Sequence, residues 1–308
     1  MPPETINCII TSPPYWQLRD YHVEGQLGLE STVDEYIQRL CDVFDEAQRV
    51  LKPNGTCWVN MGDTYWSQGV KQAGFNQRWH RRMFLPDKQS AIDSQRPVRP
   101  QTALRKKSLV LLPFRFGLEM LNRGWILRNT IIWQKPNCLP ESVKDRFTID
   151  FEYLFFFSKS ENYFFEPQYE PHSLVTKRRI SSFRRNNERF DPARHKLNPT
   201  PGEPSPFEIL ERISRNGLNP RGRNKRCIWT IPVRGFSGPH FATFPEQLIE
   251  TPIQAGCPKG GIVCDPFFGT GTTGLACRRL QRHFVGIELN IDYVRLAQER
   301  LGLRNPKV

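Results

Sequence analysis

The chain of 308 residues carries a formal net charge of +13 and has a mean hydropathy of −0.55. Its length suits one large domain with an insertion, or two modest domains. The sequence shows neither a signal peptide nor an apolar run of membrane-spanning length, so we expect a soluble, cytoplasmic protein. Its eight cysteines form no Cys-x-x-Cys pair and have no histidine at ligand spacing. This pattern disfavours a metal site and indicates a reducing compartment.

The positive charge is concentrated in two segments. Residues 171–235 contain 15 Lys and Arg against 5 Asp and Glu, and residues 78–107 contain 9 against 2. The rest of the chain is therefore slightly acidic. A basic face on a near-neutral body is the charge distribution expected of a protein that binds a polyanion, although either segment alone could be a solvated loop.

The apolar pattern predicts strands that alternate with helices. A buried strand is expected over residues 6–10, and Thr32 with Glu35 resembles a capping box that opens an amphipathic helix ending near Leu51. Further strands are expected over residues 56–61, 125–133, 151–157, 261–264 and 283–287, and further helices over residues 108–122, 207–213, 245–255, 271–280 and 291–301. This order predicts an α/β fold with a mostly parallel sheet covered on both faces.

A glycine-rich turn follows the predicted strand 261–264, in the segment Asp265–Gly274. Gly269 and Gly271 let the backbone approach a ligand closely, and the helix that follows offers free N–H groups. Glu288 lies about 20 residues further on, at the end of the next strand, where an acid accepts hydrogen bonds from ribose hydroxyls. The spacing differs from Gly-x-Gly-x-x-Gly and no P-loop lysine follows, so an adenosyl cofactor is favoured over a dinucleotide or a triphosphate.

Asp265, at the end of the same strand, suits the ammonium group of an amino-acid-bearing cofactor such as S-adenosylmethionine. The alternative for this carboxylate is to cap the turn that follows it.

The sequence Ser12-Pro13-Pro14-Tyr15 follows the first predicted strand. An exocyclic base amine is a poor nucleophile because its lone pair is delocalised. The Ser12 hydroxyl and the Pro13 carbonyl can each accept one N–H of such an amine, while consecutive prolines fix φ and donate no competing N–H. The Tyr15 ring offers a surface on which a base can stack, and Trp16 either extends that surface or packs inside the protein.

These residues resemble the amino-methyltransferases of bacterial restriction–modification systems, in the permuted class that places the Pro-Pro-Tyr motif before the cofactor motifs. Only the segments from about residue 64 to 107 and from 166 to 235 fall outside the resemblance. Further blocks that match the family are residues 60–65, 124–137, 141–146, 152–155 and 240–245.

The resemblance implies a circularly permuted, Rossmann-like fold that uses S-adenosylmethionine. It implies a catalytic half over residues 1–165, an inserted target-recognition region over 166–235, and a cofactor-binding half over 236–308. The residues expected to hold the cofactor are Thr243, Phe244, Pro245, Asp265, Phe267, Gly269, Gly271, Thr272 and Glu288.

In the family, a serine before Pro-Pro-Tyr usually accompanies methylation of cytosine N4, whereas Asp or Asn accompanies adenine N6. Ser12 therefore indicates cytosine, with adenine as the alternative. No Pro-Cys nucleophile loop is visible, which argues against methylation of cytosine C5. Relatives also carry a further strand with a Gly-Asp pair before the catalytic motif. Because only ten residues precede Thr11, either the true start lies further upstream or the strand is missing, and a missing central strand is expected to leave the sheet gapped.

The expected partner is double-stranded DNA, from which the target base must be flipped into the pocket. The side chains expected to contact DNA are Arg178, Arg179, Arg184, Arg185, Arg221, Arg223 and Lys225. A cognate endonuclease would act separately, and the enzyme would be a monomer or a weak dimer. The alternatives are methylation of a protein glutamine, which the motif order disfavours, methylation of RNA, and a non-catalytic DNA-binding relic.

Overall fold

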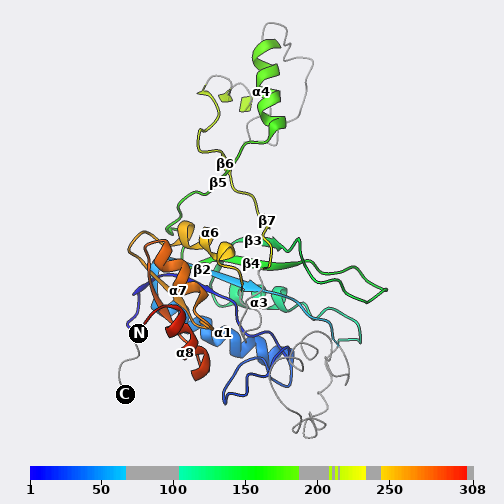
Figure 1. Ribbon diagram of the computed structural model, residues 1–308, viewed down its shortest axis with the longest axis vertical. Helices are drawn as coiled ribbons and strands as arrows, with labels where there is room; N and C mark the ends of the chain where they lie inside the picture. Colours follow the sequence, from blue (N-terminus) through cyan, green and yellow to red (C-terminus); the bar gives the residue numbers. More distant parts are fainter. Residues whose placement is uncertain (67–103, 187–207, 210–211, 214–215, 234–243, 304–308) are drawn as a thin grey trace. The chain divides into compact units, whose positions relative to one another are not determined.

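The computed structural model describes two compact units of the chain, the first comprising residues 1–166 and 227–308 and the second residues 167–226 (Figure 1). The described residues are all those outside 67–103, 187–207, 210–211, 214–215, 234–243 and 304–308. Within them, no helix combines the length and the apolar character that a bilayer-spanning segment needs.

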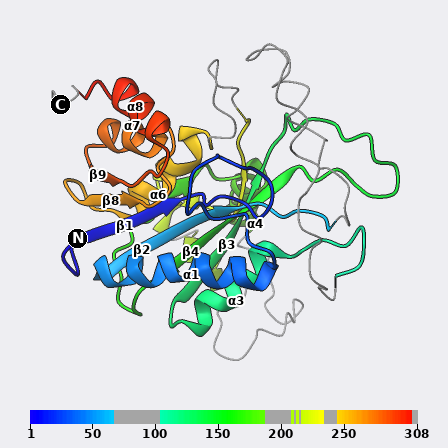
Figure 2. The same ribbon diagram turned by 90° about the horizontal axis from the view of Figure 1, so that it is seen from below.

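A seven-stranded sheet forms the centre of the first unit, in the spatial order β7-β3-β4-β2-β1-β8-β9 (Figure 2). β4 runs antiparallel to both of its neighbours, and all other neighbouring pairs are parallel. The strands are β1 (Ile6–Thr11), β2 (Leu51–Met61), β3 (Ile126–Gln134), β4 (Phe151–Ser158), β7 (Ile228–Thr230), β8 (Ile262–Asp265) and β9 (His283–Gly286). The predicted α/β fold with a mostly parallel sheet is confirmed.

Helices bury both faces of this sheet, which explains why its central strands read as almost continuous apolar runs. The Ile9 side chain belongs to the core that α1 and α3 cover, whereas Cys8 and Ile10 belong to the core that α6 and α7 cover. The helices of this unit are α1 (Val33–Val50), α3 (Leu112–Asn122), α6 (Glu246–Gly256), α7 (Thr272–Arg279) and α8 (Ile291–Arg300).

Two element boundaries differ from the sequence predictions, each because of a contact distant in sequence. β2 begins at Leu51 rather than at residue 56, because Leu51 already pairs with Ile6 before the register shifts. α3 begins at Leu112 rather than at residue 108. Leu111 adopts a left-handed conformation with φ 62°, and the Asp63 carboxylate accepts the N–H groups of Leu111 and Leu112, each at 3.1 Å.

The expected gap in the sheet does not occur among the described strands. β1 is hydrogen-bonded to β2 on one side and to β8 on the other, and β8 pairs with β9. The prediction was wrong because it placed the missing strand at the centre of the sheet, whereas the first strand after the N-terminus already fills the place beside β8.

The second unit contains α4 (Leu174–Asn186) and a short antiparallel pair, β5 (Tyr169–Glu170) with β6 (Arg223–Asn224). α4 was not predicted, because its sequence is rich in arginine and serine and Ile180 is the only residue of its first nine that is buried. The helix expected over 207–213 lies partly outside the described residues. The β5–β6 pair fixes where the chain enters and leaves this unit.

Gly256, the last residue of α6, lies where this helix packs closely on the sheet. A Cβ atom there would overlap Thr56 Oγ1 and lie 2.6 Å from Trp58 Nε1, and both side chains are buried. Thr56 Oγ1 also donates a hydrogen bond to the Gly256 carbonyl, at 3.0 Å, so it cannot withdraw without losing that bond. We expect Gly256→Ala to lower the free energy of unfolding by roughly 1–3 kcal/mol.

Urea unfolding of the two proteins measures this difference. Gly117→Ala in α3 is the matched control, since a Cβ atom there meets only the Phe155 ring, at 3.5 Å. Equal effects of the two substitutions would show that α6 has room to move.

Candidate active site

Both sequence motifs lie at the same edge of the sheet. Thr11 ends β1, Asp265 ends β8, and the two strands are parallel neighbours. The Ser-Pro-Pro-Tyr segment and the glycine turn therefore leave the sheet side by side, at the carboxyl ends of the strands, where open α/β sheets bind ligands.

The Asp265 carboxylate joins the two motifs. Its side chain is 1% exposed and accepts hydrogen bonds from Thr11 Oγ1 at 2.6 Å, Thr273 Oγ1 at 2.6 Å and the Phe267 N–H at 3.1 Å. Burial raises the pKa of Asp265 to about 6, although these three hydrogen bonds oppose the rise. Three of its about four acceptor positions are occupied and the side chain is 1% exposed, so a cofactor ammonium could contact this carboxylate only if the surrounding groups moved. The Phe267 contact is the turn cap that we gave as its alternative role.

Glu288 lies beside the glycine turn, although 19 residues separate it from Gly269. Its Oε2 accepts the Gly269 N–H at 2.7 Å, and its Oε1 accepts the Asn290 N–H at 2.8 Å. A carboxylate has about four acceptor positions, so this half-buried group can accept further hydrogen bonds. Gly269 has φ 54°, and a Cβ atom there would meet nothing within 4 Å, so the turn faces open space.

Phe268 supports the glycine turn from below. Its N–H donates to the Ile287 carbonyl at 2.9 Å, and its ring stacks on Phe284 with centroids 5.7 Å apart. A Cβ atom on Gly286 would overlap the Phe268 ring, and one on Gly274 would lie 2.9 Å from it. Two glycines outside the turn thus let this ring pack beneath it. The neighbouring residues Phe267, half-buried, and Thr272, buried, also belong to this segment.

Hydrogen bonds hold the Ser-Pro-Pro-Tyr segment in place. Tyr36 of α1 donates its hydroxyl to the Pro14 carbonyl at 2.8 Å. Gly28, with φ 98°, passes so close that a Cβ atom there would lie 3.1 Å from the Tyr15 carbonyl oxygen. Trp16 is buried against Trp66, with ring centroids 5.8 Å apart, and donates its indole N–H to the Glu30 carbonyl at 2.9 Å. Of its two possible roles, Trp16 therefore has the packing one.

Tyr15 belongs to a polar cluster that sequence reasoning did not identify as a unit. Its hydroxyl donates to Glu152 Oε2 at 2.8 Å, the Asn60 amide donates to the same oxygen at 3.0 Å, and Lys135 forms an ion pair with Glu152 Oε1. Burial, followed by the nearby Glu152 charge, raises the pKa of Tyr15 well above its usual value, although a hydrogen bond with Ser12 opposes this. Tyr15 is therefore a neutral phenol at physiological pH.

The sequence contained a signal for this cluster. Asn60 lies near the end of β2, Lys135 directly follows β3, and Glu152 is the second residue of the antiparallel strand β4. All three positions meet at the sheet edge that carries Ser12. In the sequence these residues stand only as parts of blocks that match the family, because their meeting depends on the strand order.

The segment after Trp16 reaches the side of the site that carries the glycine turn. The Tyr21 ring meets the edge of the Tyr293 ring of α8, with centroids 6.2 Å apart. Burial raises the pKa of Tyr21; the nearby Arg19 opposes the rise and the charge of Glu288 adds to it. The segment that begins at Ser12 therefore extends from the polar cluster around Glu152 to the acidic side chain beside the glycine turn.

The remaining predicted cofactor residues lie at the start of α6. Phe244 is half-buried against the core on the α6 face, and Pro245 is buried at the helix N-cap position. Thr243 lies outside the described residues.

The predicted DNA-contacting residues fall in the second unit. Arg178 and Arg179 are exposed on α4, and Lys225 is exposed near β6. Arg221 is exposed and lies over the Tyr169 ring, 4.6 Å from its centroid, while Arg223 pairs with Glu170 at 2.8 Å and so joins β6 to β5. The side chains of Arg184 and Arg185 lie outside the described set.

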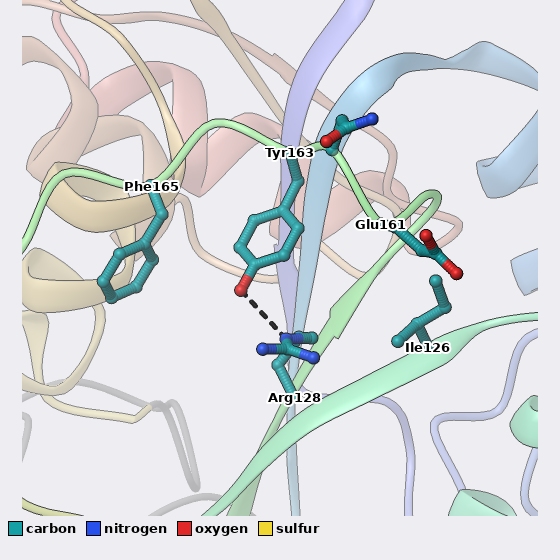
Figure 3. Close-up of a pocket in the computed structure, with 6 residues that line it drawn as sticks. Ile126, Arg128, Glu161, Tyr163 and Phe165 are labelled. Atoms are coloured by element: carbon teal, nitrogen blue, oxygen red, sulfur yellow. Dashed lines mark hydrogen bonds between the residues drawn. The ribbon is translucent and has the colours of Figure 1, made fainter. Parts of the chain in front are cut away.

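A separate hollow of about 740 Å³ lies at the opposite edge of the sheet (Figure 3). It opens beside the first residue of β3, Ile126, and the segment that follows β4. There the Arg128 Nε donates to the Tyr163 hydroxyl at 2.9 Å. Its distance along the strands from Ser12 and Glu288 separates it from the site described above.

Comparisons with known proteins agree with this fold. A model of the DNA methylase family matches residues 6–299. The Type II methyltransferase M.XycI of Xanthomonas campestris pv. cyanopsidis is 39% identical over 310 residues, covering 100% of this chain and 85% of the relative. M.Cfr9I of Citrobacter freundii is 38% identical, covering 98% of this chain and 83% of the relative.

Two solved structures share the fold. The cytosine-N4-specific PvuII DNA methyltransferase aligns with a TM-score of 0.57 and 19% identity, covering 100% of this chain and 83% of that one. TTHA0409 of Thermus thermophilus, in complex with S-adenosyl-L-methionine, aligns with a TM-score of 0.55 and 22% identity, covering 100% and 90%.

The chain belongs to the DNA methylase family. The predicted resemblance to the amino-methyltransferases of restriction–modification systems is thereby confirmed, and the protein is a DNA methyltransferase.

The raised pKa of Asp265 makes a prediction about stability and pH. A carboxyl group whose folded-state pKa exceeds its unfolded value stabilises the fold when it is protonated, and this contribution is lost as the pH rises through the folded-state value. Between the ordinary value of 3.8 and about 6, wild-type protein should therefore lose up to about 3 kcal/mol relative to Asp265→Asn, which cannot ionise.

Urea unfolding of both proteins between pH 4 and 7 measures this difference. A difference between wild type and Asp265→Asn that stays constant over this pH range would show that the Asp265 pKa is not raised.

Proposed function

We propose that this DNA methyltransferase transfers a methyl group from S-adenosylmethionine to the N4 amine of cytosine within a short duplex sequence, as part of a restriction–modification system. The observation that carries the proposal is the hydrogen bond between Thr11 and Asp265. It sets the segment that can hold an amine directly beside the segment that can hold a nucleoside.

The residues at the glycine turn fit the nucleoside part of S-adenosylmethionine. The turn at Gly269 faces open space, and the half-buried Glu288 carboxylate beside it retains acceptor positions for two ribose hydroxyls. The structure of TTHA0409 was determined with this cofactor bound, which supports the same assignment here. When bound, the cofactor supplies a methyl group already activated by its sulfonium.

Asp265 fits the ammonium group less well, since its carboxylate is buried and already accepts three internal hydrogen bonds. We therefore assign this side chain a positioning role. It holds the last residue of β1 and the first turn of α7 in fixed relation, so that the amine and the methyl donor meet in one geometry, the condition under which positioning accelerates a reaction.

The chain's own residues would prepare the amine. The Ser12 hydroxyl and the Pro13 carbonyl would accept its two N–H groups, drawing the nitrogen toward a tetrahedral geometry and exposing its lone pair. The Tyr15 ring would stack on the base. Glu152 would hold Tyr15 in place through the 2.8 Å hydrogen bond to the phenol, and Lys135 would balance the charge of Glu152.

Contacts with DNA are assigned to the second unit and to basic residues near the site. The exposed arginines Arg178 and Arg179 on α4 suit phosphate groups. Arg223 pairs with Glu170 and so contributes first to holding the second unit together.

Cytosine N4 is chosen over adenine N6 on the basis of Ser12 and of the likeness to the PvuII enzyme, which is cytosine-N4-specific. The decisive experiment is expression in a host without DNA methylation, followed by genome sequencing that detects modified bases. We expect N4-methylcytosine within one short motif. N6-methyladenine would retain the mechanism and contradict our interpretation of Ser12, whereas an unmodified genome would contradict the proposed activity.

Ser12 is the residue whose replacement separates chemistry from cofactor binding. We expect Ser12→Ala to lower kcat by roughly 100-fold or more, because one of the two amine acceptors is lost, while S-adenosylmethionine binds within a few-fold of wild type. Steady-state methylation and calorimetric titration with the cofactor measure these two quantities. Ser31→Ala, in an exposed position before α1, is the matched control. Equal losses of binding and turnover in Ser12→Ala would identify Ser12 as structural.

A further inference from the structure

The loop between β3 and β4, residues 135–150, presents an aromatic side chain to solvent. Phe147 is 94% exposed, the highest value among the large apolar side chains that the structure describes, and Leu139 in the same loop is 57% exposed. Single apolar side chains are often exposed on proteins, so it is the surroundings of this ring that indicate a partner.

Contacts on the residues that precede Phe147 fix the loop. Arg146 pairs with Glu141 at 2.8 Å, and its guanidinium lies over the Tyr65 ring, 3.6 Å from the centroid. Asp145 forms an ion pair with Lys107. The backbone beside Phe147 is therefore anchored at two points while the ring itself remains uncovered. Because the loop is already ordered before binding, a partner that contacts this ring pays a smaller entropic penalty.

The loop also begins and ends in the candidate active site. Lys135 at its start and Glu152 just after its end form an ion pair, and Glu152 accepts the Tyr15 hydroxyl. Since β4 is antiparallel to β2 and β3, the loop leaves the sheet at the edge that carries Ser12. Figures 1 and 2 show it, in green, extending beyond the ends of these strands. The loop that carries the exposed Phe147 ring is thus connected directly to Glu152, the residue that accepts the Tyr15 hydroxyl.

Positive charge lies next to the same loop. Arg105 and Lys106 are exposed and directly precede Lys107, which is paired to Asp145. A phenylalanine flanked by exposed cations suits nucleic acid, whose phosphates attract the cations and whose stacked bases accept an inserted ring. This combination favours DNA over a second copy of the chain, whose own basic segments would repel these residues.

We infer that Phe147 is inserted into the duplex at the position that the target base vacates. The inference rests on the proposed function, because it assumes that the base leaves the stack to reach Tyr15. Flipping breaks stacking and pairing interactions, and an apolar side chain that fills the gap compensates for part of this loss. The ion pair between Lys135 and Glu152 links the inserted loop to the site that receives the base.

The test compares Phe147→Ala with wild type in the full-length protein. Two duplexes carrying the motif found by genome sequencing are used, one fully paired and one with a mismatch at the target base. On the paired duplex we expect kcat/KM to fall roughly 10- to 100-fold, because flipping becomes less favourable. On the mismatched duplex, where less pairing is lost, the variant should come within about threefold of wild type.

Two control variants accompany this comparison. Phe147→Leu keeps an apolar group that can fill the gap and should retain most activity, whereas Val143→Ala changes a 42% exposed residue of the same loop and should have no effect. Fluorescence of a 2-aminopurine placed at the target position reports flipping directly, and its rise on binding should be reduced in Phe147→Ala.

The outcomes that would overturn the inference are distinct. Equal losses of kcat/KM on both duplexes would show that Phe147 acts in a step after flipping or in folding of the protein. No loss on either duplex would show that Phe147 is not part of the DNA interface. A change in the sedimentation of Phe147→Ala with unchanged kinetics would show that a second copy covers the ring. Absence of DNA methylation by wild type would instead contradict the proposed function, whatever Phe147 does.

Discussion

The arrangement of the site depends on one buried carboxylate. Asp265 binds Thr11, the last residue before Ser12, and Thr273 in the first turn of α7, and it caps the turn through Phe267. Two motifs that are about 250 residues apart in sequence are thereby fixed to each other at the ends of neighbouring strands. The arrangement explains why an ionisable group is kept in the interior although burial raises its pKa to about 6, since a neutral residue with fewer acceptor positions could not satisfy all three donors.

A second carboxylate, Glu152, completes the geometry from the other side. It lies at the start of the one antiparallel strand in the described sheet, so its position depends on the reversal of β4. Tyr15, Asn60 and Lys135 converge on it from three other segments. The Ser-Pro-Pro-Tyr segment is therefore anchored at Thr11 by Asp265 and at Tyr15 by Glu152. The residues proposed to contact the base lie between these two anchors, on a segment whose freedom is restricted at both ends.

Much of this arrangement was predictable from the sequence, and the parts that were not share a cause. Local patterns identified β1, the Thr32 cap of α1, the glycine turn and the acid at Glu288, because each depends on residues close in sequence or on the next strand along the chain. The start of α3 was misplaced because its cap, Asp63, lies 48 residues earlier. The Tyr15–Glu152 contact joins residues 137 apart across strands whose order the sequence does not state. The helix α4 was missed because its first nine residues bury only Ile180 and so have no apolar stripe.

The pairing of β5 with β6 has an evolutionary consequence. The chain enters the second unit at Pro167 and leaves it at Arg226. Close to these two points, β5 and β6 are joined by main-chain hydrogen bonds and by the ion pairs of Glu170 with Arg223 and Arg226. A segment whose two ends are already joined can be replaced as a unit, because a new segment need only keep the β5–β6 pair and can differ in the residues between these strands. Recombination at this point would exchange residues 167–226 while leaving the sheet, Asp265 and Glu152 unchanged. A lineage could in this way diversify the segment without evolving its chemistry again.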